Sequence, residues 1–147
     1  MKRIAVSAAA IVWCGTAHAT GGFSCSVADK VMSLDIQAGV TRGMGSPVFS
    51  LQGAMHLADE TLADDLRDMR FEREHLAQYW LDGEELRFVL YRERGEEKPH
   101  GEVQLTVAAR AGADGTYTGT YELKGSDMTG GRQQDFGATG SIECTVE

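Results

Sequence analysis

The segment Glu102–Lys124 reads EVQLTVAARAGADGTYTGTYELK, and its pattern decides the fold class. Apolar and polar residues alternate on both sides of a short loop rich in glycine and aspartate, Ala111–Gly115. Alternation with a period of two is typical of a strand with one buried and one solvated face, and two such runs around a short loop predict a β-hairpin. We therefore expect two antiparallel strands here, with Tyr117 and Tyr121 on the buried face.

The same alternation recurs along the chain outside this hairpin. It predicts further strands at 23–27, 32–40, 49–57, 86–92 and 138–146. Seven or eight strands with short connections, and no linker or internal repeat, indicate a single all-β domain, either an antiparallel up-and-down barrel or a sandwich. A barrel is filled by apolar side chains from several strands, and those expected inside are Phe49, Leu51, Met55, Phe88, Leu90, Val107 and Tyr121.

The middle of the chain fits two patterns, because its apolar residues have helical spacing at first and then alternate as in a strand. We expect a loop or a single helical turn at 58–65, a strand at 67–73 and a short helical turn at 74–78. The dipeptide Asp82–Gly83 then predicts a tight hairpin turn before the strand at 86–92.

The first nineteen residues have the organisation of a secretory signal peptide. A basic head at 1–3 precedes an apolar run at 4–14, and Ala17 and Ala19 are small residues at the two positions that signal peptidase reads. The apolar run is too short for a transmembrane anchor. We therefore expect a signal peptide at 1–19, a single periplasmic or secreted domain at 20–147, and no membrane insertion after cleavage.

Two cysteines remain after this cleavage, Cys25 and Cys144, near the two ends of the mature chain. Each lies on the apolar face of its own expected strand, and an even number of cysteines in an exported protein indicates a disulfide. We expect a structural bond between Cys25 and Cys144 that closes the fold from the N-terminal to the C-terminal strand.

The chain is acidic, with a formal net charge of −8 that becomes −10 when Lys2 and Arg3 leave with the signal peptide. This excess of negative charge argues against nucleic acid or an anionic membrane as the partner. It is compatible with a basic protein as the partner. The acidity is concentrated at 59–102, where 14 acidic residues stand against 7 basic ones.

Catalytic motifs are absent from the sequence. It contains neither a G-x-S-x-G nor an S-x-x-K nucleophile motif, and it contains no H-E-x-x-H metal motif. His56, His75 and His100 are isolated from one another, and we expect them at the surface rather than on a metal ion. The prediction is a protein that is not an enzyme and that carries no cofactor and no metal.

The candidate binding residues come from two acidic turns and from the aromatic residues, and they are Glu84, Glu85, Glu96, Glu97, Trp80, Tyr91 and Tyr121. The two acidic pairs lie at opposite ends of the strand at 86–92, so a small partner would engage mainly one of them. The leading hypothesis is a non-enzymatic interaction domain for a basic protein. The alternative is a carrier with a small-ligand cavity inside the barrel.

One hairpin, Gly112–Glu122, is similar to a hairpin in the avidin family of biotin-binding barrels, where a tyrosine at the position of Tyr121 touches the ligand. The resemblance implies a β-barrel, but it covers eleven of 147 residues, and it lies near the C-terminus rather than early in the chain. The family's tryptophan walls and Asn/Ser ligand set have no counterpart, because Trp80 is the one tryptophan of the mature domain and the chain has no asparagine. We therefore expect no biotin site.

Small periplasmic lysozyme inhibitors are also acidic, secreted β-barrels that carry a disulfide. This chain is similar to them in these general properties but shares no motif with them. The similarity is the reason why the leading hypothesis includes an inhibitor-like protein.

Overall fold

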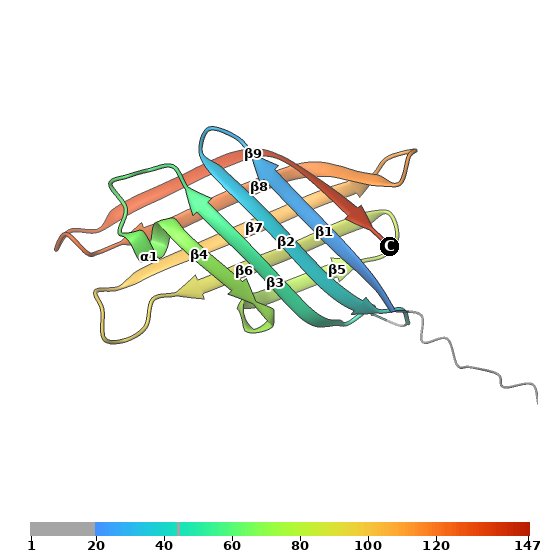
Figure 1. Cartoon of the computed structure of the whole chain (residues 1–147), viewed down its shortest axis with the longest axis horizontal. Helices are drawn as coiled ribbons and strands as arrows, with labels where there is room; N and C mark the ends of the chain where they lie inside the picture. Colours follow the sequence, from blue (N-terminus) through green and yellow to red (C-terminus); the bar gives the residue numbers. More distant parts are fainter. Residues whose placement is uncertain (1–19, 44) are drawn as a thin grey trace, which may run out of the picture.

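Nine antiparallel strands form a nearly closed barrel in the computed structural model, which describes residues 20–43 and 45–147 (Figure 1). The strands are β1 Thr20–Ala28, β2 Met32–Thr41, β3 Val48–Leu57, β4 Asp68–Glu72, β5 Leu76–Leu81, β6 Glu85–Glu93, β7 Gly101–Ala111, β8 Thr116–Asp127 and β9 Gln134–Val146. The expected all-β barrel is confirmed, with a strand more than expected. The predicted signal peptide at 1–19 lies outside the described residues.

The sheet runs in the order β4-β3-β2-β1-β9-β8-β7-β6-β5, so the first and last strands of the domain pair with each other. Cys25 and Cys144 lie directly opposite each other in that β1–β9 ladder and form the predicted disulfide. A bond between residues 119 positions apart removes much freedom from the unfolded chain, which typically stabilises a fold by about 2–4 kcal/mol.

The barrel has one seam, between the edge strands β4 and β5. These strands follow each other in the chain and are joined by a single 3₁₀ turn, η1 (Arg73–His75), but they pair with different neighbours. β4 pairs with β3, and β5 pairs with β6. A bulge between Leu76 and Gln78 helps β5 to change direction. The expected strand at 67–73 is thus β4, whereas most of the helical turn expected at 74–78 is strand.

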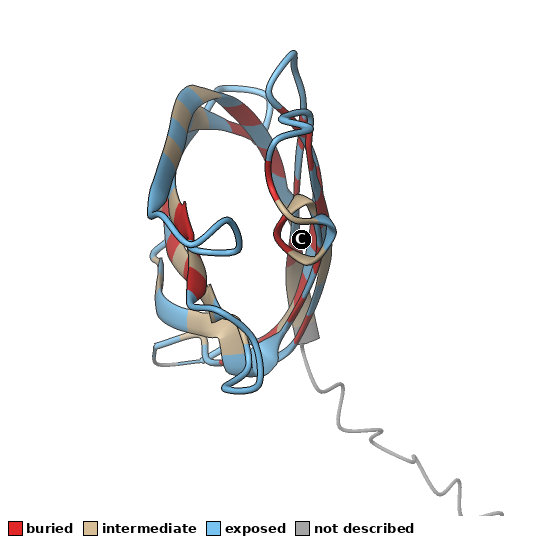
Figure 2. Cartoon of the chain, turned by 90° about the vertical axis from the view of Figure 1, so that its left-hand side faces the viewer, coloured by how far each residue is buried: buried red, intermediate tan, exposed pale blue. Residues whose placement is uncertain are grey.

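Buried and exposed residues alternate along the strands, as Figure 2 shows. Six of the residues expected inside the barrel are buried, namely Leu51, Met55, Phe88, Leu90, Val107 and Tyr121. The prediction for Phe49 was wrong, because its side chain is 56 % exposed. Val40 pairs with Val48 and Gly39 with Ser50, so Phe49 is the extra residue of a β-bulge and points outward.

The two ends of the barrel are built differently. The closed end consists of the connections at 29–31, 58–67, 94–100 and 128–133, and it carries the short helix α1 (Asp64–Arg67). Leu62 and Leu66 from this region are buried in the core, so the loop at 58–65 and one helical turn cover the barrel mouth. None of the helices in the described residues is long and apolar enough to cross a membrane.

The open end consists of the connections at 42–47, 82–84 and 112–115 and of both chain termini of the described domain. The turn predicted at Asp82–Gly83 is present and is three residues long. The Asp82 carboxylate accepts hydrogen bonds from the amides of Glu84 (3.1 Å) and Glu85 (2.9 Å), and Gly83 has a φ of 91°, which glycine adopts without strain.

Candidate functional site

The structure separates the predicted binding residues instead of bringing them together. Trp80, Glu84 and Glu85 lie at or near the open end, whereas Glu96 and Glu97 lie in the closed-end connection at 94–100. The two turns stand at opposite ends of β6, as the sequence predicts.

Neither of the two predicted tyrosines offers a free hydroxyl group. Tyr121 is 1 % exposed, and its hydroxyl donates to the Asp29 carboxylate; burial and this contact raise the pKa of Tyr121 to about 12. Tyr91 is half-buried and donates to Glu102 (2.8 Å), which raises the pKa of Tyr91 to about 12. Both groups stabilise the barrel wall rather than project from it.

One of the two glutamates in the acidic pair at the open end is neutralised by arginines. Glu85 is partly buried, and its carboxylate forms an ion pair with Arg87 (2.7 Å) and accepts a hydrogen bond from Arg110. Glu84 is exposed and has no cation within salt-bridge distance among the described residues. This turn therefore presents one unpaired glutamate.

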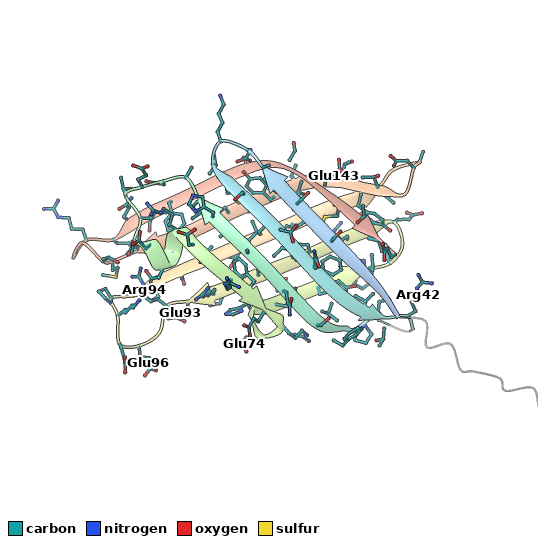
Figure 3. The ribbon with its side chains drawn as sticks, in the orientation of Figure 1. Arg42, Glu74, Glu93, Arg94, Glu96 and Glu143 are labelled. Carbon is teal, nitrogen blue, oxygen red and sulfur yellow. A yellow bond between two sulfur atoms is a disulfide. The ribbon has the colours of Figure 1, made fainter. Side chains whose placement is uncertain are left out.

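The acidic pair at the closed end is fully available. Glu96 and Glu97 are exposed, and no ion pair involves either of them in the part of the chain that the structure describes. Figure 3 shows Glu96 projecting from its loop, away from the barrel. We call residues 94–100 the acidic loop.

A buried arginine anchors the acidic loop. The Arg94 side chain is 3 % exposed and forms a bidentate ion pair with Asp65 through Nε (2.9 Å) and Nη2 (3.0 Å). Its Nη1 donates to Asp127 (3.1 Å), to the carbonyl of Pro99 (2.8 Å) and to Thr129 Oγ1 (3.0 Å). Arg94 thus connects the start and end of the loop to α1 and to the β8–β9 connection.

Asp127 is the second centre of this cluster. It is 4 % exposed, and its carboxylate accepts hydrogen bonds from Thr129, from the Ala63 amide (3.0 Å) and from Arg94. Burial alone would raise the pKa of Asp127, but these hydrogen bonds outweigh it and lower the pKa to about 2. The carboxylate is therefore ionised at neutral pH.

Backbone hydrogen bonds hold the rest of the acidic loop. The Arg94 amide donates to the Gly101 carbonyl (2.7 Å), and the Lys98 amide donates to the Gly95 carbonyl (3.2 Å). The Met128 amide binds the His100 carbonyl (2.9 Å), and the Lys98 ammonium group adds an ion pair to Asp65 (3.1 Å). The two free carboxylates are thus carried by a fixed loop.

A hollow of about 360 Å³ lies beside the acidic loop, lined by Asp65, Leu66 and the residues from Arg92 to Lys98. Its lining carries four acidic residues, Asp65, Glu93, Glu96 and Glu97, and three basic ones, Arg92, Arg94 and Lys98. A lysine or arginine side chain of a partner would meet the unpaired carboxylates of Glu96 and Glu97 there.

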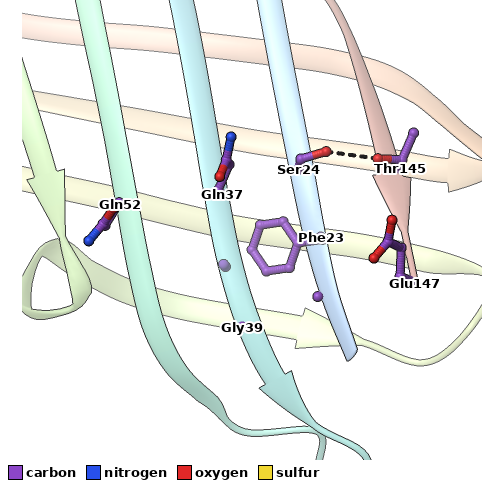
Figure 4. Close-up of a pocket in the computed structure, with 9 residues that line it drawn as sticks. Phe23, Ser24, Gln37, Gly39, Gln52, Thr145 and Glu147 are labelled. Carbon is purple, nitrogen blue, oxygen red and sulfur yellow. Dashed lines mark hydrogen bonds between the residues drawn. The ribbon is translucent and has the colours of Figure 1, made fainter. Parts of the chain in front are cut away.

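A second hollow, of about 400 Å³, lies on the outer wall over β1, β2, β3 and β9 (Figure 4). Its polar lining is mostly hydroxyl and amide groups, with Ser24, Gln37, Gln52 and Thr145 in one row, and Ser24 and Thr145 hydrogen-bonded to each other (2.8 Å). Glu147 at its edge is the one titratable residue among those lining it.

The histidines take ordinary surface roles. His56 pairs with Asp68 (2.6 Å), His75 accepts the Glu72 amide within η1 (2.9 Å), and His100 lies near Glu93 (3.4 Å). Over residues 20–43 and 45–147, no group of three or more His, Cys, Asp or Glu side chains has the arrangement of a metal site.

Sequence reasoning found the acidic loop but missed Arg94 as its anchor. An arginine between Glu93 and Gly95 in a polar turn is typical of a solvent-exposed residue, and only the fold brings Asp65 and Asp127 to Arg94. Searches of protein families, curated proteins and solved structures found no match to this chain, so the site stands on its own geometry.

Proposed function

We propose that this protein is a non-enzymatic interaction domain of the periplasm or the secreted fraction, and that it binds a basic protein through the acidic loop. The observation that carries the proposal is the rigid display of Glu96 and Glu97, two exposed carboxylates without a cation of their own. A preorganised loop loses little conformational entropy when it binds, which favours affinity.

The charge distribution supports the same conclusion. The segment 59–102 carries 14 of the 22 acidic residues, and it contains α1, β4, β5, β6 and the acidic loop. The same segment carries 7 basic residues, so its net charge is −7 (14 acidic against 7 basic residues). An excess of negative charge accelerates the approach of a basic protein, and the effect weakens as salt is added. An inhibitor that inserts an acidic loop into a basic cleft would have this construction.

The carrier alternative has less support. It requires free volume inside the barrel, where six of the seven residues named as barrel filling are buried side chains. The described hollows lie on the outer wall, beside the acidic loop and at the open end instead.

The test uses lysozyme as a basic probe protein, immobilised and presented with the domain at low and at physiological ionic strength. We expect retention at low salt, inhibition of the lysozyme, and association slowed by about threefold to tenfold in the double variant Glu96→Gln/Glu97→Gln. The matched control, Glu84→Gln/Glu143→Gln, removes the same charge from two exposed positions elsewhere. Equal slowing in both variants, or no retention and no inhibition at low salt, contradicts the proposal.

A further inference from the structure

The outer edge of β5 exposes backbone groups that no strand satisfies. The Asp82 amide donates to the Glu85 carbonyl (3.3 Å), so Asp82 and Glu85 are a hydrogen-bonded pair at the end of the β5–β6 ladder. This pair shows which residues of β5 bond to β6. In an antiparallel pair only alternate residues bond across the ladder, so Trp80 and Gln78 bond to β6. The N–H and C=O groups of Tyr79 and Leu81 therefore point away from β6, toward the seam.

Side chains substitute for a strand elsewhere along the seam but not here. Arg73 Nε donates to the carbonyl of Val48 in β3 (2.9 Å), and Arg92 Nη1 donates to the carbonyl of Arg70 in β4 (2.9 Å). The described residues provide no such partner for the backbone of Tyr79 or Leu81. An unpaired edge of this kind is a template for an added strand.

A hollow of about 520 Å³ lies beside this edge at the open end. On one side it is lined by Tyr79, Trp80 and Leu81, and Val40 and Val146 are further apolar lining residues. The other side is lined by Arg42, Gly43, Gly45 and Ser46. Trp80 is 58 % exposed, an unusual position for a tryptophan.

The hydroxyl group of Tyr79 also lacks a partner. Its oxygen is buried and forms no hydrogen bond, while the ring stacks on Phe23 (5.7 Å between centroids). Burial raises the pKa of Tyr79 to about 12, so the group is a neutral donor. A buried hydroxyl without a partner costs free energy, and the cost disappears when a ligand supplies an acceptor.

We propose that the open seam at β5 binds an extended segment of another protein by strand addition. The backbone of the segment pairs with Tyr79 and Leu81, apolar side chains on its inner face enter the hollow, and one of its carbonyl or hydroxyl oxygens accepts the Tyr79 hydroxyl. This site lies at the opposite end of the barrel from the acidic loop and does not depend on the function proposed for that loop.

The geometry favours a single strand over a second copy of the domain. The hollow next to the edge of β5 is bounded on the far side by Arg42, Gly43, Gly45 and Ser46 of the same molecule. An extended segment is much thinner than a second barrel, which would meet these residues. The apolar lining calls for a segment with apolar residues at every second position.

The test uses capped peptides of about seven residues in which threonine alternates with valine, leucine or phenylalanine, with a lysine at each end for solubility. Trp80 is the one tryptophan in residues 20–147, so in a domain prepared without residues 1–19 its fluorescence reports on this site alone. We expect a saturable blue shift of the Trp80 emission. Amide exchange of Tyr79 and Leu81 should slow by about tenfold when the peptide is present at ten times its dissociation constant.

Two matched comparisons isolate strand addition. N-methylation of the peptide amides that face β5 should abolish binding, whereas N-methylation of the alternate amides should leave it unchanged. Gly43→Phe places bulk at the hollow and should weaken binding, whereas Gly130→Phe at the closed end should not. A Cβ atom at either glycine has no atom beyond its chain neighbours within 4 Å, and neither glycine has a positive φ, so both variants should fold.

Three results would overturn the proposal. The first is that neither the Trp80 emission nor the amide exchange of Tyr79 and Leu81 changes up to about 1 mM peptide, because a dissociation constant above about 1 mM would be too weak to support the proposal. The second is binding that tolerates N-methylation in either register. The third is concentration-dependent protection of Tyr79 and Leu81 without peptide, which would make a second copy of the chain the occupant.

Discussion

The two ends of this barrel solve the same problem in opposite ways. Each end has to satisfy the polar groups of its loops and cover an apolar interior. At the closed end, Arg94 binds Asp65 and Asp127, and Leu62 and Leu66 cover the core. At the open end, Tyr79 buries a hydroxyl without a partner, and β5 leaves its edge unpaired. Arg94 and Arg42 lie at these two opposite ends of the barrel (Figure 3).

The difference teaches where stability and binding reside in one small domain. A cluster in which each charge has several partners is rigid and costly to disturb, so it suits a loop that must keep its shape. Buried polar groups without a partner reduce stability, and natural structures retain few of them. Among the described residues, one such side-chain group, Arg67 Nε, lies in α1 at the closed end, and the other is the Tyr79 hydroxyl. A ligand is assigned to the open end because there the Tyr79 hydroxyl occurs together with the unpaired edge of β5.

The largest expected effect is at the closed end. Arg94→Met keeps most of the side-chain volume but leaves Asp65 and Asp127 without their buried cation, and it should lower the free energy of unfolding by about 3–5 kcal/mol. Urea denaturation measures the change. The control Arg42→Met removes an exposed arginine at the open end and should change stability by no more than about 0.5 kcal/mol. Similar losses in both variants would show that the two ends do not differ as described.

The second prediction concerns the pH dependence of the closed end. The pKa of Asp127 is about 2 in the folded protein, against an ordinary value of 3.8. Between these values the unfolded chain binds a proton that the folded protein does not, so acid favours unfolding. This carboxylate should therefore add about 2 kcal/mol of stability above pH 4 that is lost as the pH falls toward about 2.

The measurement is urea denaturation at a series of pH values, with the variant Asp127→Asn as the comparison. The asparagine side chain does not titrate, so the variant should lose this part of the slope between about pH 2 and pH 4. Parallel curves for the two proteins would mean that Asp127 has the same pKa folded and unfolded.

The sequence predicted most of the fold because its signals are local and periodic. Alternation along the strands identifies the inner face, and it also places Cys25 and Cys144 on that face, where the barrel brings them opposite each other. Phe49 shows the limit of this reasoning. One inserted residue changes the direction of the following side chains, and nothing in the alternation at 49–57 marks where the bulge falls.

The sites were less predictable because their parts come from distant segments. Glu96 and Glu97 were found as an acidic turn, but the cluster that fixes their loop joins residues 65, 94 and 127. The open seam arises where one stretch of chain changes pairing partner, from β3 to β6, and strand periodicity carries no information on partners. Local sequence patterns thus show which face of a strand is buried. Predicting the sites at the ends of the barrel also requires knowing which strands are neighbours.

The smallest expected effect has the opposite sign and belongs to the open end. Tyr79→Phe removes a buried hydroxyl that has no partner, so the free domain should be unchanged or more stable by up to about 1 kcal/mol. Tyr117→Phe is the matched control, because the Tyr117 hydroxyl donates to the Gly83 carbonyl (2.7 Å) at the same end. Losing that hydrogen bond should cost about 1 kcal/mol. Urea denaturation of the two variants side by side measures the difference, and equal destabilisation would show that the Tyr79 hydroxyl is satisfied in the free protein.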